Sequence, residues 1–344
     1  MALVAREEPE PKRQRLDVVP AGPGYDGVVA VPANQRKSGI LAPTMLLTGH
    51  QGEVFSCEFS PDGRNLASGS FDKQIYLWQT YEECPNWCVL KGHTNAVLEI
   101  HWKHDGTQIY SCSADKSVCV WDVEEGQRTK KFNGHQAVVN SCSPNRRGPP
   151  LLCSGADDGT TKVWDLRTRR SVNSYEHQYQ ILAVTFDDSA ERVFAGSLDN
   201  TIRVFDMRRG EEDTEMTLKG HADSITGIDL SKDGRYLLSN SMDNTVRQWN
   251  VEPFFTSRRE ITAFTGPLHN FEKNLLRVRW NAADTMCGVG SSDRFVYVFD
   301  TKERKLLYKL PGHTGSVNEV CFHPTEPVIA SASNDKRIYM GELA

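Results

Sequence analysis

The amino-acid sequence predicts an all-β fold built from seven similar units that repeat along the chain. A histidine recurs seven times, at intervals of 43, 42, 42, 44, 48 and 44 residues. An aspartate follows each of these histidines 22 to 24 residues later, and in the first six units an aromatic residue stands six positions after that aspartate. Self-similarity at such a period is typical of solenoids and propellers, in which each unit packs on the next.

Each unit contains short segments in which apolar and polar residues alternate with a period of two, as expected for β-strands. In the first unit these segments read VFSCEF, NLASGS and QIYLW. Turn sequences separate the segments, such as PDG at 61–63, HDG at 104–106 and KDG at 232–234. Short strands joined by tight turns and repeated radially form a β-propeller, so we predict blades arranged around a central channel.

The units open with a Gly-His pair or its equivalent, as in GHTNAVLEI at 92–100, and close with a pair such as Trp-Asp at 121–122. In this pattern they resemble the WD40 repeat, and the resemblance covers residues 45–343. It implies a seven-bladed WD40 β-propeller with four strands in each blade. It also implies that a hydrogen-bond chain of Asp, His, Ser and Trp ties the loops of a blade to its strands.

Four units carry all four residue types of this structural tetrad. The tetrads are His50, Ser68, Asp72 and Trp78; His93, Ser111, Asp115 and Trp121; His135, Ser154, Asp158 and Trp164; and His221, Ser239, Asp243 and Trp249. The fourth unit replaces serine and tryptophan together, by Ala195 and Phe205, and the sixth does so by Val289 and Phe299. Because phenylalanine has no N–H group that needs an acceptor, the serine hydroxyl becomes dispensable in these units.

The same residues argue against catalysis. A Ser-His-Asp nucleophile would be a single site and not a motif copied around a ring. No phosphate-binding loop or unrepeated acid–base pair supports an enzyme. Cys84 and Cys88 are followed by His93, but a zinc site usually needs a second ligand pair. We therefore expect a protein that is not an enzyme and that holds no cofactor and no metal.

Composition and charge bear on three further classes: nucleic-acid-binding, membrane and secreted proteins. The formal net charge is −5, so a nucleic-acid site would have to be a local patch. No apolar run approaches the ~18 residues of a membrane span. The first residues lack the apolar core of a signal peptide. The nine cysteines are scattered through apolar stretches, which is typical of free thiols in a reducing compartment.

The chain divides into a tail and a ring. Residues 1–40 are rich in proline and charge with little periodicity, which predicts a disordered tail. Within it PKRQR at 11–15 is either a nuclear import signal or simply part of a solvated tail. Residues 41–344 form the predicted propeller. We expect 41–48 to supply the outer strand of the last blade, because each WD40 unit begins with the outer strand of the preceding blade.

Several phrases carry a closer resemblance. They are NRRGP (145–149), LHNFEKNLLR (268–277), DRFVYVFD (293–300), YKLPGH (308–313) and DKRIYMGEL (335–343). They are similar to the WD40 subunits of the spliceosomal U5 small nuclear ribonucleoprotein. This resemblance implies a nuclear scaffold in pre-mRNA splicing, with the largest U5 core protein, the U5 GTPase, the U5 helicase and the U5 RNA particle as neighbours. The alternative is a WD40 adaptor of another nuclear complex, such as a ubiquitin-ligase substrate receptor or a chromatin reader.

The residue before each repeated aspartate is expected at the rim of the face that bears the histidines. Phe71, Leu198 and Met242 are large and apolar at this position, and Phe271 and Arg294 extend the same face. Exposed apolar clusters often mark protein contacts. The alternative is that each side chain folds onto its own blade.

Paired arginines are expected to form a basic arc on the opposite face, over three adjacent blades. The pairs are Arg146 and Arg147, Arg169 and Arg170, Arg208 and Arg209, and Arg258 and Arg259. Such an arc would suit phosphates of small nuclear RNA or pre-mRNA, or an acidic protein segment. Carboxylates at 211–213 and 260 lie near in the sequence, and a merely solvated rim is the alternative.

Overall fold

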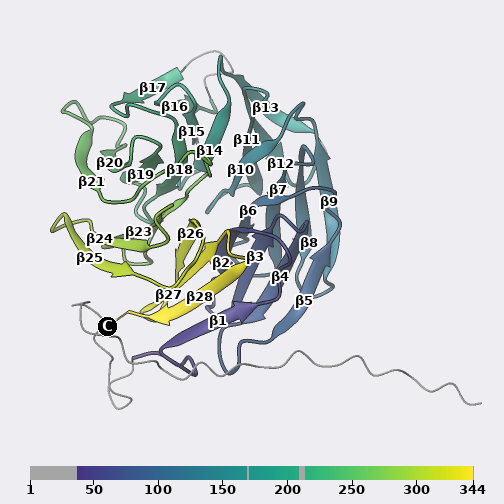
Figure 1. Ribbon diagram of the computed structural model, residues 1–344. Coiled ribbons are helices and arrows are strands. Elements are labelled where there is room, and N and C mark those ends of the chain that lie inside the picture. Colours follow the sequence, from purple (N-terminus) through teal and green to yellow (C-terminus); the bar gives the residue numbers. More distant parts are fainter. Residues whose placement is uncertain (1–36, 169, 209–213, 344) are drawn as a thin grey trace, which may run out of the picture. The chain divides into compact units, whose positions relative to one another are not determined.

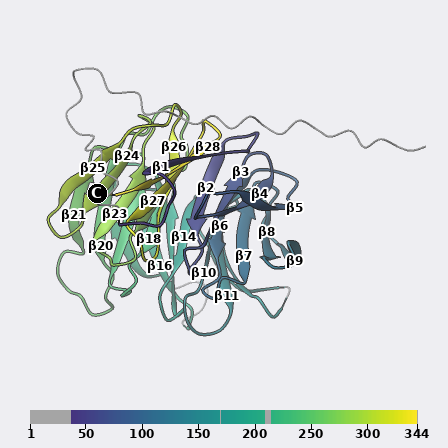
Figure 2. The ribbon, with the colours of Figure 1, turned by 90° about the horizontal axis from the view of Figure 1, so that it is seen from below.

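The computed structural model describes residues 37–168, 170–208 and 214–343, and all regular elements in these ranges are β-strands. The strands form seven four-stranded antiparallel sheets arranged around a central axis (Figure 1). The predicted all-β, seven-bladed propeller is therefore confirmed. Figure 2 shows the strands running between the two faces of the ring.

The first strand of each blade is innermost and the fourth is outermost. Blade 1 contains β2 (Val54–Phe59), β3 (Asn65–Ser70), β4 (Gln74–Gln79) and β5 (Asn86–Lys91). Blade 2 contains β6 (Val97–Trp102), β7 (Gln108–Ser113), β8 (Ser117–Asp122) and β9 (Gln127–Asn133). Blade 3 contains β10 (Val139–Pro144), β11 (Leu151–Ala156), β12 (Thr160–Asp165) and β13 (Ser171–Glu176). Blade 4 contains β14 (Ile181–Phe186), β15 (Arg192–Ser197), β16 (Thr201–Asp206) and β17 (Thr214–Lys219).

The remaining blades follow the same order. Blade 5 contains β18 (Ile225–Leu230), β19 (Tyr236–Ser241), β20 (Thr245–Asn250) and β21 (Glu260–Thr265). Blade 6 contains β22 (Val278–Trp280), β23 (Met286–Gly290), β24 (Val296–Asp300) and β25 (Lys305–Leu310). Blade 7 contains β26 (Val317–Phe322), β27 (Val328–Ser333), β28 (Arg337–Glu342) and β1 (Thr44–Thr48).

The core lies between the blades. Seven clusters of buried apolar residues each combine side chains from two neighbouring blades. Between blades 1 and 2, for example, Ile75 and Leu77 pack with Val97 and Ile100. Successive side chains of a strand point to opposite faces of its sheet. Apolar side chains on both faces are buried because each face is covered by a neighbouring blade.

The two ends of the ring meet in blade 7. Strand β1 pairs antiparallel with β28, so Leu47 stands opposite Ile338 and both are buried (Figure 1, purple beside yellow). Ile40 is 2% exposed and belongs to the cluster between blades 7 and 1. The compact unit begins at Lys37, four residues before the boundary expected from composition. The rest of the expected tail, with PKRQR, lies outside the described residues.

All nine cysteines are free, and eight of them are buried. None of the described residues forms a helix long and apolar enough to cross a membrane.

Candidate interaction surfaces

The hydrogen-bond chain expected from the repeat can be followed in blade 2. His93 Nδ1 lies 2.9 Å from Asp115 Oδ2, and His93 Nε2 lies 2.7 Å from Ser111 Oγ. The Trp121 indole N–H donates to the same hydroxyl oxygen at 2.7 Å. In blades 1, 3 and 5 the corresponding distances range from 2.7 to 3.0 Å. The serines are fully buried, so the chain of bonds stabilises each blade from within.

The aspartate of the tetrad joins two loops. In blade 2, Asp115 Oδ2 accepts hydrogen bonds from the His93 ring and from the backbone N–H of Thr94, ahead of the first strand. Its Oδ1 accepts from the backbone N–H and the hydroxyl of Ser117, the first residue of the third strand. Burial alone would lower the pKa of His93, but hydrogen bonds with Asp115 and Cys119 raise it to about 9.

Blades 4 and 6 replace the tetrad by other contacts. In blade 4, Asp199 forms an ion pair with Arg203 at 2.8 Å. In blade 6, Asp293 accepts a hydrogen bond from the Tyr297 hydroxyl at 2.5 Å, and its carboxylate lies 3.6 Å from Lys309 Nζ. These substitutes were not predicted from the sequence, although Arg203 and Tyr297 both stand four residues after their aspartates.

We call the face with the repeated histidines the histidine face. Phe71, Leu198, Met242 and Arg294 all lie on turns between the second and third strands, and these turns reach this face. Phe71 is 57% exposed and packs edge-on against Phe55, with ring centroids 6.4 Å apart. Leu198 and Arg294 are exposed, whereas Met242 is half-buried. The candidates therefore differ in how much surface they offer a partner.

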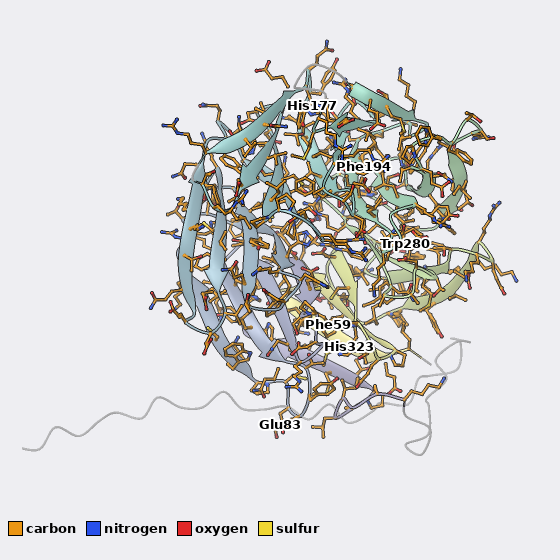
Figure 3. The ribbon with its side chains drawn as sticks, turned by 180° about the vertical axis from the view of Figure 1, so that it is seen from behind. Phe59, Glu83, His177, Phe194, Trp280 and His323 are labelled. Atoms are coloured by element: carbon orange, nitrogen blue, oxygen red, sulfur yellow. The ribbon has the colours of Figure 1, made fainter. Side chains whose placement is uncertain are left out.

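Phe271 is the most exposed of these candidates, at 90%, and lies in the long segment between β21 and β22. Two further exposed apolar residues on this face were missed by the sequence analysis, Tyr179 and Leu268. Tyr179 and Leu198 line a hollow of about 300 Å³ together with His177 (Figure 3 labels His177). Leu268 directly precedes the repeated histidine His269, and Tyr179 follows His177 by two residues. These positions in the repeat are the sequence signal that could have indicated them.

The opposite face carries the loops with the paired arginines, but Arg169 and Arg209 lie outside the described residues. Apart from Arg146, three of the remaining arginines are ion-paired with carboxylates of nearby loops or strands. These pairs are Arg147 with Asp188, Arg208 with Glu191, and Arg258 with Glu260. Arg259 donates to the backbone carbonyls of Asn250 and Glu252, and Arg170 is exposed.

Arg146 differs from the other arginines because its side chain crosses from blade 3 to blade 5. Its guanidinium donates to the carbonyls of Ser231 at 2.7 Å and Leu230 at 2.5 Å. It also lies 3.8 Å from Asp229 Oδ1. The structure therefore separates Arg146 from the outward-facing arc in which the sequence analysis had placed it.

The innermost strands contain a buried ionic cluster that the sequence analysis also missed. Arg279 Nε donates to Glu319 Oε1 at 2.7 Å, and Arg279 Nη2 lies 3.7 Å from Glu99 Oε1. His101 lies between Glu58, at 3.4 Å, and Glu99, at 3.6 Å. Burial alone would lower the pKa of His101, but the neighbouring Glu58 carboxylate raises it to about 9. The signal in the sequence was LLRVRW at 275–280, in which one arginine directly precedes an innermost strand and a second lies within it.

Carboxylates of this cluster also link neighbouring blades through the backbone. Glu99 accepts the N–H of Cys142 at 3.0 Å, and Glu319 accepts the N–H of Cys57 at 3.0 Å. Each acceptor lies on the innermost strand of one blade and each donor on that of the next. The ionic cluster therefore contributes to the closure of the ring as well as to the charge of the channel.

Comparisons with known proteins agree with the observed fold. The family model of the WD domain, G-beta repeat, matches residues 41–79, and the model described as IFT122 first beta-propeller matches residues 87–340. The U5 small nuclear ribonucleoprotein 40 kDa protein of Bos taurus is 51% identical over 342 residues, which cover 96% of this chain and 95% of the relative.

More distant organisms have similar proteins. The U5 small nuclear ribonucleoprotein 40 kDa protein of Dictyostelium discoideum is 46% identical over 332 residues, covering 96% of this chain and 92% of the relative. Pre-mRNA-splicing factor cwf17 of Schizosaccharomyces pombe is 41% identical over 309 residues, covering 90% of each. The chain therefore belongs to the WD40-repeat family, and within it to the family of U5 small nuclear ribonucleoprotein 40 kDa proteins.

Proposed function

We propose that this protein is a nuclear, non-enzymatic scaffold of the U5 small nuclear ribonucleoprotein that acts in pre-mRNA splicing. The observation that carries the proposal is identity of 51% across almost the whole chain to a protein named for that particle. The similarity to a pre-mRNA-splicing factor over 90% of both chains supports the same process. The similarity spans all seven blades and is not confined to one repeat.

The geometry of the propeller supports a scaffold. The serine hydroxyls of the tetrads are buried and already occupied by histidine and tryptophan, so they are not available to a substrate. What the fold offers to solvent is two broad faces made of loops on a rigid ring. Loops held by a rigid scaffold are the usual place for binding residues.

We assign protein contacts to the histidine face, with the apolar residues Phe71, Leu198, Met242 and Phe271 and the charged residue Arg294 as contributors. The expected partners are the largest U5 core protein, the U5 GTPase and the U5 helicase. Phe71 and Phe271 support this assignment most strongly, because exposed aromatic side chains lose the most water-accessible apolar area on binding.

Affinity purification of the tagged full chain from nuclear extract tests the proposed function. We expect U5 proteins and U5 RNA to be recovered together. Recovery of both should persist after RNA that does not belong to the U5 particle has been removed from the extract. A tagged unrelated propeller serves as the control. Recovery of a ubiquitin ligase or of histones without U5 RNA would contradict the proposal and support the alternative adaptor.

A further inference from the structure

A cavity of about 430 Å³ occupies the central channel on the face opposite to the histidines. It is lined by the ends of the innermost strands, among them Phe59 and Trp280, and by the loops that join first to second strands. Figure 3 shows Phe59 and Trp280 closer to the axis of the ring than Glu83, which lies at its outer edge. The volume is in the range of small-ligand sites.

The channel is filled by Arg277 on the histidine side of this cavity. Arg277 Nη1 donates to the carbonyls of Leu182 and Thr226, each at 3.0 Å, and Nη2 donates to the carbonyl of Asn140 at 2.5 Å. Its Nε lies 3.7 Å from Glu99. These partners come from blades 2, 3, 4 and 5, so one side chain of blade 6 spans the channel.

A glycine, Gly227, makes room for this arrangement. A Cβ atom at Gly227 would lie 2.9 Å from the Cα of Arg277, so glycine permits the close approach of the two backbones. Arg277 spans the channel at this level, and the loops of the opposite face line the cavity, so the cavity opens toward that face. A partner that uses the cavity must therefore approach that face.

Charged side chains of the innermost strands, together with Arg277, line the cavity and its floor. The carboxylates are Glu58, Glu99, Asp229 and Glu319, and the cations are Arg277, Arg279 and protonated His101. Burial of so many charges is costly unless each finds a partner. One carboxylate, Asp229, lies beside a further cation from a loop outside this set, Arg146.

Asp229 is part of a site that fits a guanidinium group. Its Oδ2 accepts the backbone N–H of Trp280 at 2.8 Å, which leaves Oδ1 facing the mouth of the cavity. The guanidinium of Arg146 lies there, 3.8 Å from Asp229, and donates to the carbonyls of Leu230 and Ser231. Burial raises the pKa of the Asp229 carboxyl, and nearby arginines oppose that shift.

We propose that the mouth of the channel is a binding site for an arginine side chain of a protein partner, and that Arg146 occupies this site in the free protein. Three acceptors, one carboxylate and two carbonyls, match the fork of a guanidinium better than the point charge of a lysine. Of the apolar residues that line the cavity here, Trp280 is 9% exposed and can contact the methylene stem of such a side chain.

Arg146 competes with a partner arginine for this site. Arg146 extends from a loop, and its side chain is 38% exposed, so it can leave without unfolding a strand. A partner arginine has to displace Arg146. The apparent affinity for the partner is therefore the intrinsic affinity multiplied by the fraction of molecules in which the site is open. Removal of Arg146 should therefore increase the affinity for arginine.

Binding of Nα-acetyl-arginine amide to the purified full chain tests this inference by NMR or calorimetry. We expect Arg146→Gln to bind the probe at least tenfold more tightly than the parent protein. Arg146→Lys, which keeps a charge near Asp229, should fall between the two and provides a second variant if the first is unstable. The citrulline analogue, a neutral isostere of the probe, should not bind.

Two variants locate the binding. Asp229→Asn in the Arg146→Gln background should abolish the gain, and the asparagine oxygen can still accept the N–H of Trp280. Arg170→Gln, a change at an exposed arginine of the same face, should leave binding at the parent level. Equal binding of citrulline or of Nα-acetyl-lysine amide would overturn the assignment, as would an unchanged affinity in Arg146→Gln. The test uses purified protein, so its result is separate from that of the U5 purification.

Discussion

Leu47 stands opposite Ile338 in the pair of strands that closes the ring, although the two residues lie near opposite ends of the chain. Both are buried in the cluster between blades 7 and 1. Strand β1 thus covers an edge of β28 that would otherwise be exposed to solvent and prone to aggregation.

Removal of residues 41–48 should destabilise the whole ring and not one blade alone, because β1 completes the last sheet. Leu47→Ala is a milder form of the same change and should cost about 2–5 kcal/mol of unfolding free energy. Thermal and denaturant unfolding measure both. Deletion of residues 2–34, outside the described part of the chain, is the control. A melting temperature that stays the same after removal of 41–48 would show that β1 is not required for closure.

The tetrads offer a second prediction about stability. Ser111→Ala leaves the Trp121 indole N–H and one His93 nitrogen without a partner, which should cost about 1–3 kcal/mol. The double variant Ser111→Ala with Trp121→Phe imitates Ala195 and Phe205 of blade 4. It should cost less than the sum of the single changes, by more than about 0.5 kcal/mol, because donor and acceptor are removed together. If the losses of unfolding free energy of the two single variants, measured by urea unfolding, add up to that of the double variant, serine and tryptophan are not replaced together for this reason.

The blades could be predicted from the sequence because their signals are local. A histidine and its aspartate are always 22 to 24 residues apart, so one repeat contains all the information that a tetrad needs. The channel could not be predicted in this way. Arg277 takes its partners from four other blades, at separations between 51 and 178 residues, and only the closed ring brings them together.

The arginine pairs show the same limit on the opposite face. Spacing in the repeat correctly indicates which loops carry them, but not where each guanidinium goes. Arg146 turns toward Asp229, because the buried carboxylate and two carbonyls of blade 5 provide better acceptors than water. Arg147, its neighbour, faces Asp188 instead.

The raised pKa of His101 predicts a dependence of stability on pH. Its pKa is about 9 in the folded protein against 6.5 as the ordinary value, so the folded state binds the proton more tightly. The resulting stabilisation is fully present below pH 6.5 and is lost as the pH rises to about 9. It amounts to about 3 kcal/mol at most. The groups that face the ring are Glu58, Glu99 and Arg279.

Comparison of the parent with His101→Gln isolates this contribution, since His93 titrates in the same pH range in both proteins. The unfolding free energy of the variant should fall less steeply between pH 6.5 and 9 than that of the parent. His104→Gln, at an exposed position, is the matched control and should follow the parent. Parallel profiles for parent and His101→Gln would show that the imidazole is not held protonated by its neighbours.

The assignment of the histidine face predicts a loss of association without a loss of stability. Phe71→Ala with Met242→Ala should weaken recovery of U5 proteins while the melting temperature changes little, because Phe71 is largely exposed. The matched control is Leu306→Ala with Leu307→Ala, two exposed leucines on the outer strand β25. If the Phe71 variant recovers U5 proteins as well as the control does, this face is not the contact.

The arginine loops of the opposite face predict a dependence on salt. Arg170 is exposed, and the ion pair of Arg208 with Glu191 lies at the surface, where such pairs contribute little and can exchange for a phosphate. If these loops contact RNA, binding releases counterions and weakens steeply as the salt concentration rises. Aromatic side chains for base stacking are few there, so contacts to the RNA backbone are expected rather than recognition of bases.

Reversal of Arg169, Arg170, Arg208 and Arg209 to glutamate should therefore remove the salt-dependent part of the association with U5 and leave the rest. The measurement is recovery of U5 RNA over a series of salt concentrations. Lys302→Glu with Arg304→Glu changes the corresponding loop of blade 6 and serves as the control, which should keep the slope of the parent. If the quadruple variant keeps the parent slope as well, these arginines form a solvated rim, because a phosphate contact cannot survive reversal of the charge that makes it.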